Sequence, residues 1–141
     1  MARAVLSLGA NMEDPAGQLA RAVAALRETP GISGVVESSV IVTEPWGVTD
    51  QPKFHNMALV IETTLSLLRA CLAIEAELGR VRLRRWGPRA IDIDVIAYDR
   101  VEMDTLELTL PHRYAHERDF VLVPVREIAP DEADWLMERR A

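Results

Sequence analysis

Apolar residues along the chain follow two periods, one typical of strands and one typical of helices. Residues 4–8 form a short apolar run that ends at Gly9, which predicts a buried strand. Residues 35–43 and 54–64 are rich in β-branched or apolar positions, and they predict two antiparallel strands because no helix separates them. Residues 90–98 alternate in character and predict a fourth strand.

Two further segments carry apolar residues at helical spacing. The first follows Asp14 and Pro15, a capping residue and a proline suited to the first helical position, and it ends at Pro30. The second begins after Ser66 and ends at Gly79. Both patterns predict amphipathic helices with one face in the core.

The order strand–helix–strand–strand–helix–strand predicts a ferredoxin-like α+β sandwich with an antiparallel sheet. A C-terminal appendix follows, with a hairpin expected in residues 101–110, a helix in 117–128 and a short docked helix in 131–141. A chain of 141 residues fits one domain, residues 1–141.

Composition and charge narrow the classes of partner. The net charge of −6 argues against nucleic acid, although a local basic pocket remains possible. The one cysteine excludes an intrachain disulfide, and no apolar run reaches the length of a membrane span. The apolar N-terminus is interpreted as a core strand and not as a signal peptide. We therefore expect a cytoplasmic monomer that binds neither nucleic acid nor membrane.

Asp92 and Asp94 form an acidic pair in the fourth predicted strand. Because successive side chains of a strand point to opposite faces, both carboxylates share one face, about 7 Å apart. Mg²⁺ prefers hard oxygen ligands and often takes one or two carboxylates together with substrate phosphates. Two acids on the wet face of a strand are equally compatible with solvation, so the pair alone leaves both interpretations open.

Five arginines precede the acidic pair within ten residues: Arg80, Arg82, Arg84, Arg85 and Arg89. Their mutual repulsion favours an anionic ligand, and guanidinium groups bind phosphate in a planar, bidentate manner. Metal and arginines together suit phosphoryl transfer. The alternative is a solvated basic loop that binds nucleic acid or pairs with acids of the chain.

Other residues are ambiguous on their own. His112 is more often structural than catalytic, and Phe54 and Phe120 are more often core than ligand contacts. Asn56 offers donors and an acceptor that can read a heterocycle edge or close a turn. The chain contains no G-x-x-x-x-G-K-[ST] phosphate loop.

Four ordered blocks change this picture: SLGANMEDP, EPWGVTDQPKFHNMA, ELGRVRLRRWGPRAIDID and LPHRYAHERDFVLVPVREIAP. Together they resemble the 6-hydroxymethyl-7,8-dihydropterin pyrophosphokinases of folate biosynthesis, along nearly the whole chain. The resemblance implies the ferredoxin-like fold and transfer of the pyrophosphoryl group of ATP to the hydroxymethyl oxygen of the pterin, with release of AMP. It also implies two Mg²⁺ ions, ATP and a reduced pterin as ligands.

The resemblance assigns roles to residues that the pattern alone left open. Asp92 and Asp94 would hold the metal ions and, with Arg80, Arg82 and Arg89, act in catalysis. Phe54 and Phe120 would sandwich the pterin, and Asn56 would read its edge beside backbone groups of Thr43, Pro45 and Trp46. The nucleotide contacts would come from Glu75, Arg82, Arg85, Trp86, Arg89, Val95 (through its backbone), Thr109, His112, Arg113 and Arg118.

Some positions depart from the family pattern. His55 stands where an apolar residue is usual, Glu107 where some members have a basic residue, and Arg113 where some have a tyrosine. The arginine loop is also a residue shorter than in some members, which leaves Arg84 unassigned. Two rival hypotheses are a non-catalytic nucleotide- or RNA-binding ferredoxin-like module, against which the acid pair counts, and a degenerate pterin-binding member.

Overall fold

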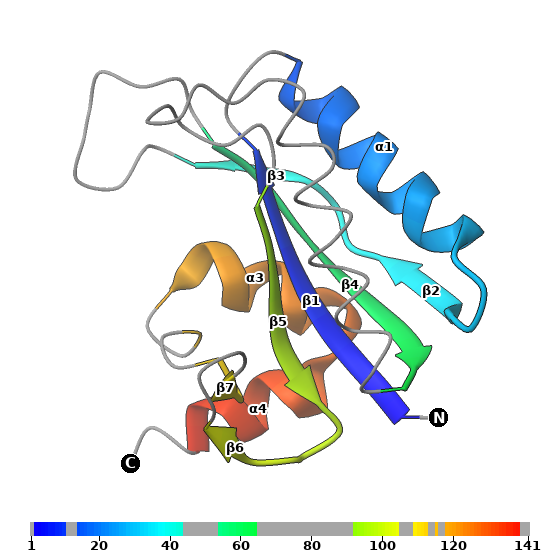
Figure 1. The fold of residues 1–141 in the computed structure, drawn as a ribbon. Helices are drawn as coiled ribbons and strands as arrows, with labels where there is room; N and C mark the ends of the chain where they lie inside the picture. Colours follow the sequence, from blue (N-terminus) through cyan, green and yellow to red (C-terminus); the bar gives the residue numbers. More distant parts are fainter. Residues whose placement is uncertain are drawn as a thin grey trace.

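The computed structural model of the 141-residue chain describes residues 2–10, 14–43, 54–64, 92–104, 109–112, 115 and 118–138. Its elements are β1 (Ala2–Ala10), α1 (Pro15–Glu28), β2 (Ser33–Glu37), β3 (Ile41–Thr43), β4 (Phe54–Thr63), β5 (Asp92–Tyr98), β6 (Met103–Asp104), β7 (Thr109–Leu110), α3 (Asp119–Ile128) and α4 (Pro130–Glu138) (Figure 1). The helix predicted between Ser66 and Gly79 lies outside the described residues.

The main sheet confirms the ferredoxin-like prediction. Its five strands have the order β2-β4-β1-β5, and β3 pairs with β4 on the same edge as β2. Every pairing is antiparallel, and β4 is central because it contacts β1 on one edge and both β2 and β3 on the other. β6 and β7 form the predicted small hairpin.

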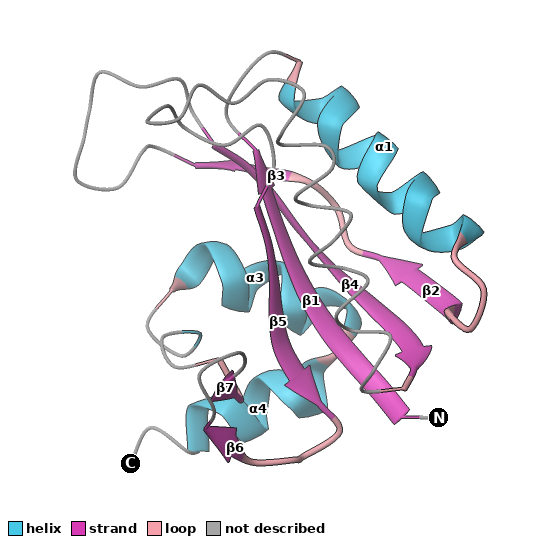
Figure 2. Cartoon of the chain, in the orientation of Figure 1, coloured by secondary structure: helices cyan, strands magenta, loops and turns pink. Residues whose placement is uncertain are grey.

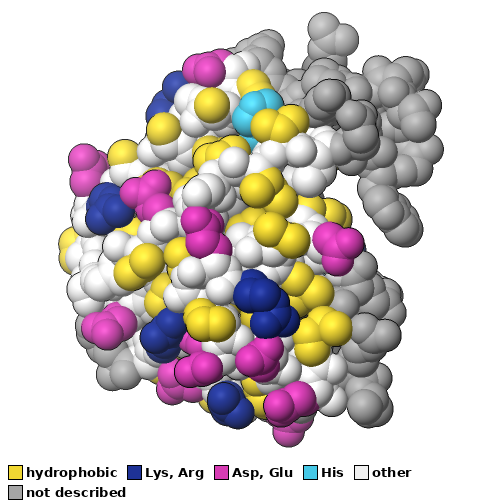
Figure 3. Space-filling view, turned by 180° about the vertical axis from the view of Figure 1, so that it is seen from behind, with side chains coloured by type: hydrophobic (Ala, Val, Ile, Leu, Met, Phe, Trp, Pro, Cys, Tyr) yellow, Lys and Arg dark blue, Asp and Glu magenta, His cyan; other side chains and the backbone are white. Residues whose placement is uncertain are grey.

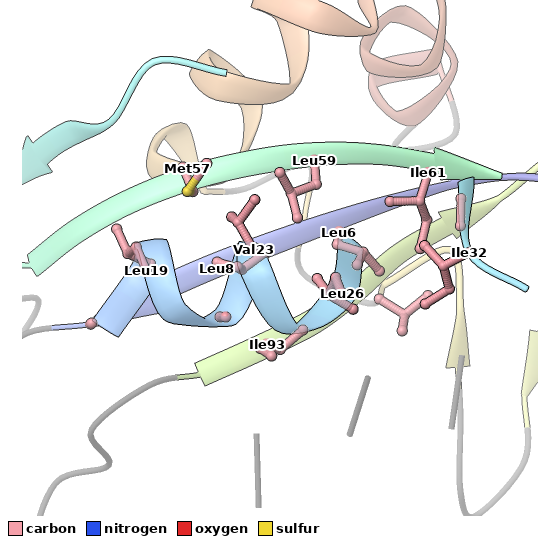
Figure 4. Close-up of a cluster of buried hydrophobic side chains, with 14 of the residues drawn as sticks. Leu6, Leu8, Leu19, Val23, Leu26, Ile32, Met57, Leu59, Ile61 and Ile93 are labelled. Atoms are coloured by element: carbon pink, nitrogen blue, oxygen red, sulfur yellow. The ribbon is translucent and has the colours of Figure 1, made fainter. Parts of the chain in front are cut away.

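The two faces of the sheet bury two separate hydrophobic clusters, so the described part of the molecule has three layers (Figure 2). Leu6 and Leu8 of β1 and Leu59 of β4 pack against Leu19 and Leu26 of α1, in what we call the α1 core (Figure 4). The apolar stripe of α1 was predicted from its spacing and is confirmed.

The opposite face carries the α3 core. Val5 of β1, Val60 of β4 and Ile96 of β5 pack there against Val121 and Val125 of α3. The predicted C-terminal appendix is therefore the cover of a second sheet face. Among the described residues, no helix is long and apolar enough to cross a membrane.

The start of α1 shows why the predicted cap works. The Asp14 carboxylate accepts a hydrogen bond of 3.2 Å from the Gly17 backbone N–H, and Pro15 occupies the first turn. This satisfies one of the amides that a helix N-terminus leaves unpaired. Local sequence alone determines this boundary, and the structure confirms it.

A β-bulge in β5 changes which side chains face each core. Leu6 of β1 pairs with Val95, but the preceding Val5 pairs with Ala97, so Ile96 is an extra residue on β5. Ile96 and Ala97 consequently both pack in the α3 core, although strict alternation would separate them.

The segment predicted as one strand over residues 35–43 is divided in the structure into β2 and β3. Glu37 pairs with Leu59 and Ile41 with Asn56, so three residues, 38–40, stand opposite two residues of β4. Ser38 causes the break: its N–H donates to the Ala58 carbonyl at 2.9 Å, and its Oγ accepts from the Ala58 N–H at 2.8 Å. The prediction of a continuous strand was wrong because a serine side chain replaces a backbone acceptor here.

We predict that Ser38→Ala lowers the free energy of unfolding by about 1–3 kcal/mol, because the buried Ala58 N–H loses its acceptor. Ser33→Ala, at an exposed position of β2, is the control and should change it by less than about 0.5 kcal/mol. Urea denaturation of the two variants measures the difference. Equal stabilities would show that Ser38 does not hold the break.

Candidate functional site

Polar side chains of β1, β4 and β5 meet at one end of the sheet, on the face that carries the α3 core. Gly9 of β1 lies in register between Asn56 of β4 and Asp92 of β5, and Ser7 pairs with Asp94. The neighbouring positions on these strands fill the α1 core, so alternation directs Ser7, Asn56 and Asp94 to the other face. Asp94 thus shares a face with Asn56.

Asn56 and Thr43 form the best-defined contact of the site. The Asn56 Nδ2 donates a hydrogen bond of 2.9 Å to the Thr43 Oγ, and Asn56 is only 3% exposed. Thr43 also pairs with Phe54 across β3 and β4, which places Phe54 on the same face. A buried amide held by a neighbouring hydroxyl is a preorganised hydrogen-bonding group.

Gly9 permits this arrangement. A Cβ added to Gly9 would lie 2.9 Å from the Asn56 Oδ1, closer than side-chain atoms normally approach. Glycine at the end of β1 is therefore required by the amide beside it. From the sequence, Gly9 was interpreted only as the end of a strand. A glycine within a strand pattern often marks a close approach of another group, and this signal could have predicted the contact with Asn56.

Phe120 and Arg118 come from the start of α3. Phe120 is partly exposed and packs against the α3 core, while the Arg118 guanidinium carbon lies 5.7 Å from the centre of its ring. Phe54 is also only partly buried. Neither aromatic is the fully buried core residue that composition alone favoured, which agrees with the pocket role that the resemblance implies.

Asp94 and His112 lie near each other along β5. Asp94 is partly exposed and pairs in register with Ser7, which is 7% exposed. The His112 N–H donates to the Ile96 carbonyl at 2.9 Å, which fixes its backbone two residues beyond Asp94 on the strand. The Val95 side chain fills the α1 core, so only its backbone is available to a ligand.

Many residues that the sequence singled out, on the pterin side and on the nucleotide side, lie outside the described residues. This applies to Pro45, Trp46, Glu75, Arg80, Arg82, Arg84, Arg85, Trp86, Arg89, Glu107 and Arg113. For Asp92 and Thr109 the structure describes the backbone and not the side chain. These assignments stay predictions.

The acidic residues of β5 suit a metal ion whose remaining ligands come from a substrate. Among the described side chains, no group of three or more His, Cys, Asp or Glu residues forms a metal site. Mg²⁺ retains waters and shares one or two protein carboxylates with phosphate oxygens, so it does not need such a group. The partly exposed Asp94 on the polar face, with Asp92 two residues away on the same strand, fits this requirement.

Comparison with known proteins identifies the family. Residues 5–130 match the 7,8-dihydro-6-hydroxymethylpterin-pyrophosphokinase family. The chain belongs to this family. A 2-amino-4-hydroxy-6-hydroxymethyldihydropteridine pyrophosphokinase of Methylorubrum extorquens is 56% identical over 134 residues, covering 93% of this chain and 85% of the relative. The enzyme of that name from Bacillus subtilis is 41% identical over 128 residues, covering 89% and 77%.

Longer proteins contain the same domain. The folic acid synthesis protein fol1 of Schizosaccharomyces pombe is 40% identical over 131 residues, which cover 91% of this chain and 18% of that protein. The crystal structure of Plasmodium falciparum HPPK-DHPS superposes with a TM-score of 0.54 at 14% identity, covering 93% of this chain and 40% of that one. This likeness supports the pyrophosphokinase-family fold.

We predict that Gly9→Ala destabilises the protein by about 1–3 kcal/mol, because the added methyl group overpacks against the Asn56 amide. Asn56→Ala removes the obstructing oxygen, so the double variant should lose less stability than the sum of the two single variants. Denaturation of the four proteins of this cycle measures the coupling. Additive losses would mean that Gly9 and Asn56 do not compete for the same space.

Proposed function

We propose that the chain transfers the pyrophosphoryl group of ATP to the hydroxymethyl oxygen of 6-hydroxymethyl-7,8-dihydropterin, giving the pterin diphosphate and AMP in tetrahydrofolate biosynthesis. The observation that carries the proposal is the family match over residues 5–130, supported by 56% identity to a relative of that name. The site agrees, because a buried amide, two partly exposed aromatics and a strand carboxylate share one face of the sheet.

The pterin suits the end of the site built from β3, β4 and α3. Asn56, held by Thr43, offers a fixed amide to the polar edge of a heterocycle. Phe54 and Phe120 offer ring faces to its flat surface. Stacking together with a few directed hydrogen bonds is the usual recognition of such a ligand.

The triphosphate suits the end built from β5 and the segment that follows it. Asp92 and Asp94 would hold two Mg²⁺ ions, which supply charge neutralisation along the phosphates. His112 and Arg118 would contact phosphate oxygens, and the predicted arginine loop would close over both ligands. Each of these contacts favours the anionic, reacting form of ATP.

The reaction depends more on the alignment of the attacking and leaving oxygens than on a strong base. The pterin hydroxymethyl oxygen forms a bond to the β-phosphorus, the bond from that phosphorus to the α–β bridging oxygen breaks, and AMP leaves with that oxygen. The alcohol proton is released during the transfer. The residues of this chain contribute by holding the alcohol in line with the leaving oxygen and by excluding water.

A non-catalytic RNA-binding module is the weaker alternative. The face in Figure 3 shows acidic and basic side chains interspersed, and the net charge is −6. RNA-binding surfaces concentrate positive charge. The charge therefore favours two small molecules over RNA as the ligands. We propose in addition that the protein is a cytoplasmic monomer.

Incubation with ATP, Mg²⁺ and the hydroxymethyl-dihydropterin should yield AMP and the pterin diphosphate in equal amounts. Asp94→Asn should lower kcat by about 10²–10³-fold, because the neutral amide would hold Mg²⁺ less well beside the transferring group. Its free energy of unfolding should change by less than about 1 kcal/mol, since the side chain is partly exposed and its shape is kept. Absence of AMP from the folded wild-type protein would overturn the proposal.

Phe120→Leu should raise KM for the pterin about tenfold, since stacking on a flat heterocycle contributes about 1–3 kcal/mol. Leucine still packs against the α3 core but offers no ring face. The control is Val123→Ala on the same helix, where the side chain is 54% exposed. Steady-state kinetics with each substrate varied in turn should show KM for ATP unchanged in both variants. A pterin KM equal to that of the wild type would remove Phe120 from the pocket.

A further inference from the structure

A charge-assisted hydrogen-bonded contact joins the β2–β3 break to α3. The Ser39 N–H donates to one carboxylate oxygen of Glu127 at 2.6 Å, and the Ser39 Oγ donates to the other at 2.7 Å. Both residues are exposed. The two bonds use both oxygens of the carboxylate, so they fix its orientation as well as its distance.

Each end of this contact leads directly to the pterin side of the site. On α3, Glu127 lies about two helical turns beyond Phe120. On the sheet, Ser39 is followed by β3, whose Thr43 holds Asn56. The contact therefore links the element that carries Phe120 to the strand that positions Asn56.

The break at residues 38–40 also determines which face Thr43 occupies. Val36 pairs with Val60, which belongs to the α3 core. Strict alternation from Val36 would give the α3 face to even-numbered residues and turn Thr43 away. The extra residue in the break reverses the alternation, so Thr43 shares the face of Asn56.

The break is anchored on both sides. Ser38 is bonded to both backbone groups of Ala58 in β4, and its Oγ also donates to the Ser39 carbonyl at 2.9 Å. Glu127 supplies the remaining anchor from α3. The hydrogen bond from the Ser39 hydroxyl and, to a smaller extent, the one from the Ser39 N–H hold the pKa of Glu127 below its ordinary value. The carboxylate is ionised at neutral pH.

We propose that Glu127 is a positioning residue for the pterin site: by holding the break at Ser39 against α3, it sets the separation between Thr43 and Asn56 on the sheet and Phe120 on the helix. This rests on the proposed function. An exposed hydrogen-bonded carboxylate contributes little to global stability. Its effect is expected in pterin affinity, because one pocket wall belongs to each of the two elements that it joins.

The test compares Glu127→Ala with Asp134→Ala. Asp134 of α4 accepts a bond of 2.7 Å from Arg126 of α3, so this contact joins α3 to α4 and not to β3. Glu127→Ala should raise KM for the pterin about tenfold, the change produced by losing one well-placed bond to a charged group. KM for ATP in that variant, and both constants in Asp134→Ala, should stay within about twofold of the wild type.

Two further variants separate positioning from a general loss of structure. In Glu127→Gln, one oxygen still accepts from the Ser39 N–H while the amide donates to the Ser39 Oγ, so most of the pterin affinity should return. Ser39→Ala removes one of the two bonds and should give an intermediate pterin KM. In Ser39→Ala/Glu127→Ala the effects should not add, because both changes break the same contact.

Several results would overturn the inference while the wild-type protein still produces AMP. These are an unchanged pterin KM in Glu127→Ala, equal increases in the KM for pterin and ATP, or an equal effect of Asp134→Ala. If Glu127→Ala does not fold, the pterin KM of Ser39→Ala decides the question. Failure of the wild-type protein to produce AMP would instead overturn the proposed function, and no Glu127 variant is needed to see it.

Discussion

The two-residue repeat of side chains in the central strands is the constraint on which the rest of the structure depends. β1, β4 and β5 each direct one set of side chains to α1 and the other set to α3 and α4. The second set is apolar over most of the sheet and polar at one end, where Ser7, Gly9, Asn56 and Asp94 lie. A shift of one residue would turn the Asn56 amide of β4, the Asp94 carboxylate of β5 or the Ser7 hydroxyl of β1 toward the α1 core.

Two irregularities adjust this repeat where it would otherwise misplace a side chain. The bulge at Ile96 turns an extra apolar residue of β5 into the α3 core directly beside Asp94. The break at residues 38–40 turns Thr43 toward Asn56. Each irregularity lies at the border between the apolar and the polar part of the same face. The site is thus produced by regular strands together with one added residue in each of two of them.

The features that sequence reasoning predicted correctly depend on neighbours along the chain. The orientation of Asp94 away from the α1 core follows from strand geometry, and the cap at Asp14 follows from a side chain reaching three residues ahead. The antiparallel ferredoxin-like sheet followed from the sequence of elements, since few topologies suit that sequence.

The features that sequence reasoning missed depend on contacts between residues that are distant in the chain. The requirement for glycine at position 9 arises from an amide 47 residues later, brought beside it by the β1–β4 register. Residues 35–43 are divided because the Ser38 side chain accepts a hydrogen bond from the Ala58 backbone N–H. No local sequence pattern predicts an extra residue in a strand. The Ser39–Glu127 contact spans 88 residues. The proposed roles of Phe54 and Phe120 come from the family resemblance and stay predictions, because the residue types alone favour core positions.

The Ser39–Glu127 contact also bears on the order of events during synthesis. The part of the proposed site that lies on the sheet uses β1, β3 and β4, all complete by Thr63, whereas Phe120 comes from α3. A chain released from the ribosome as far as β4 can pair β1, β2 and β3 with β4, but it lacks α3, which covers the other face of these strands. Pairing of β1 with β5, and docking of α3, must wait for nearly the whole chain. An incomplete chain therefore exposes the apolar side of Val5, Ala58 and Val60, and the last elements to emerge both cover that surface and complete the site.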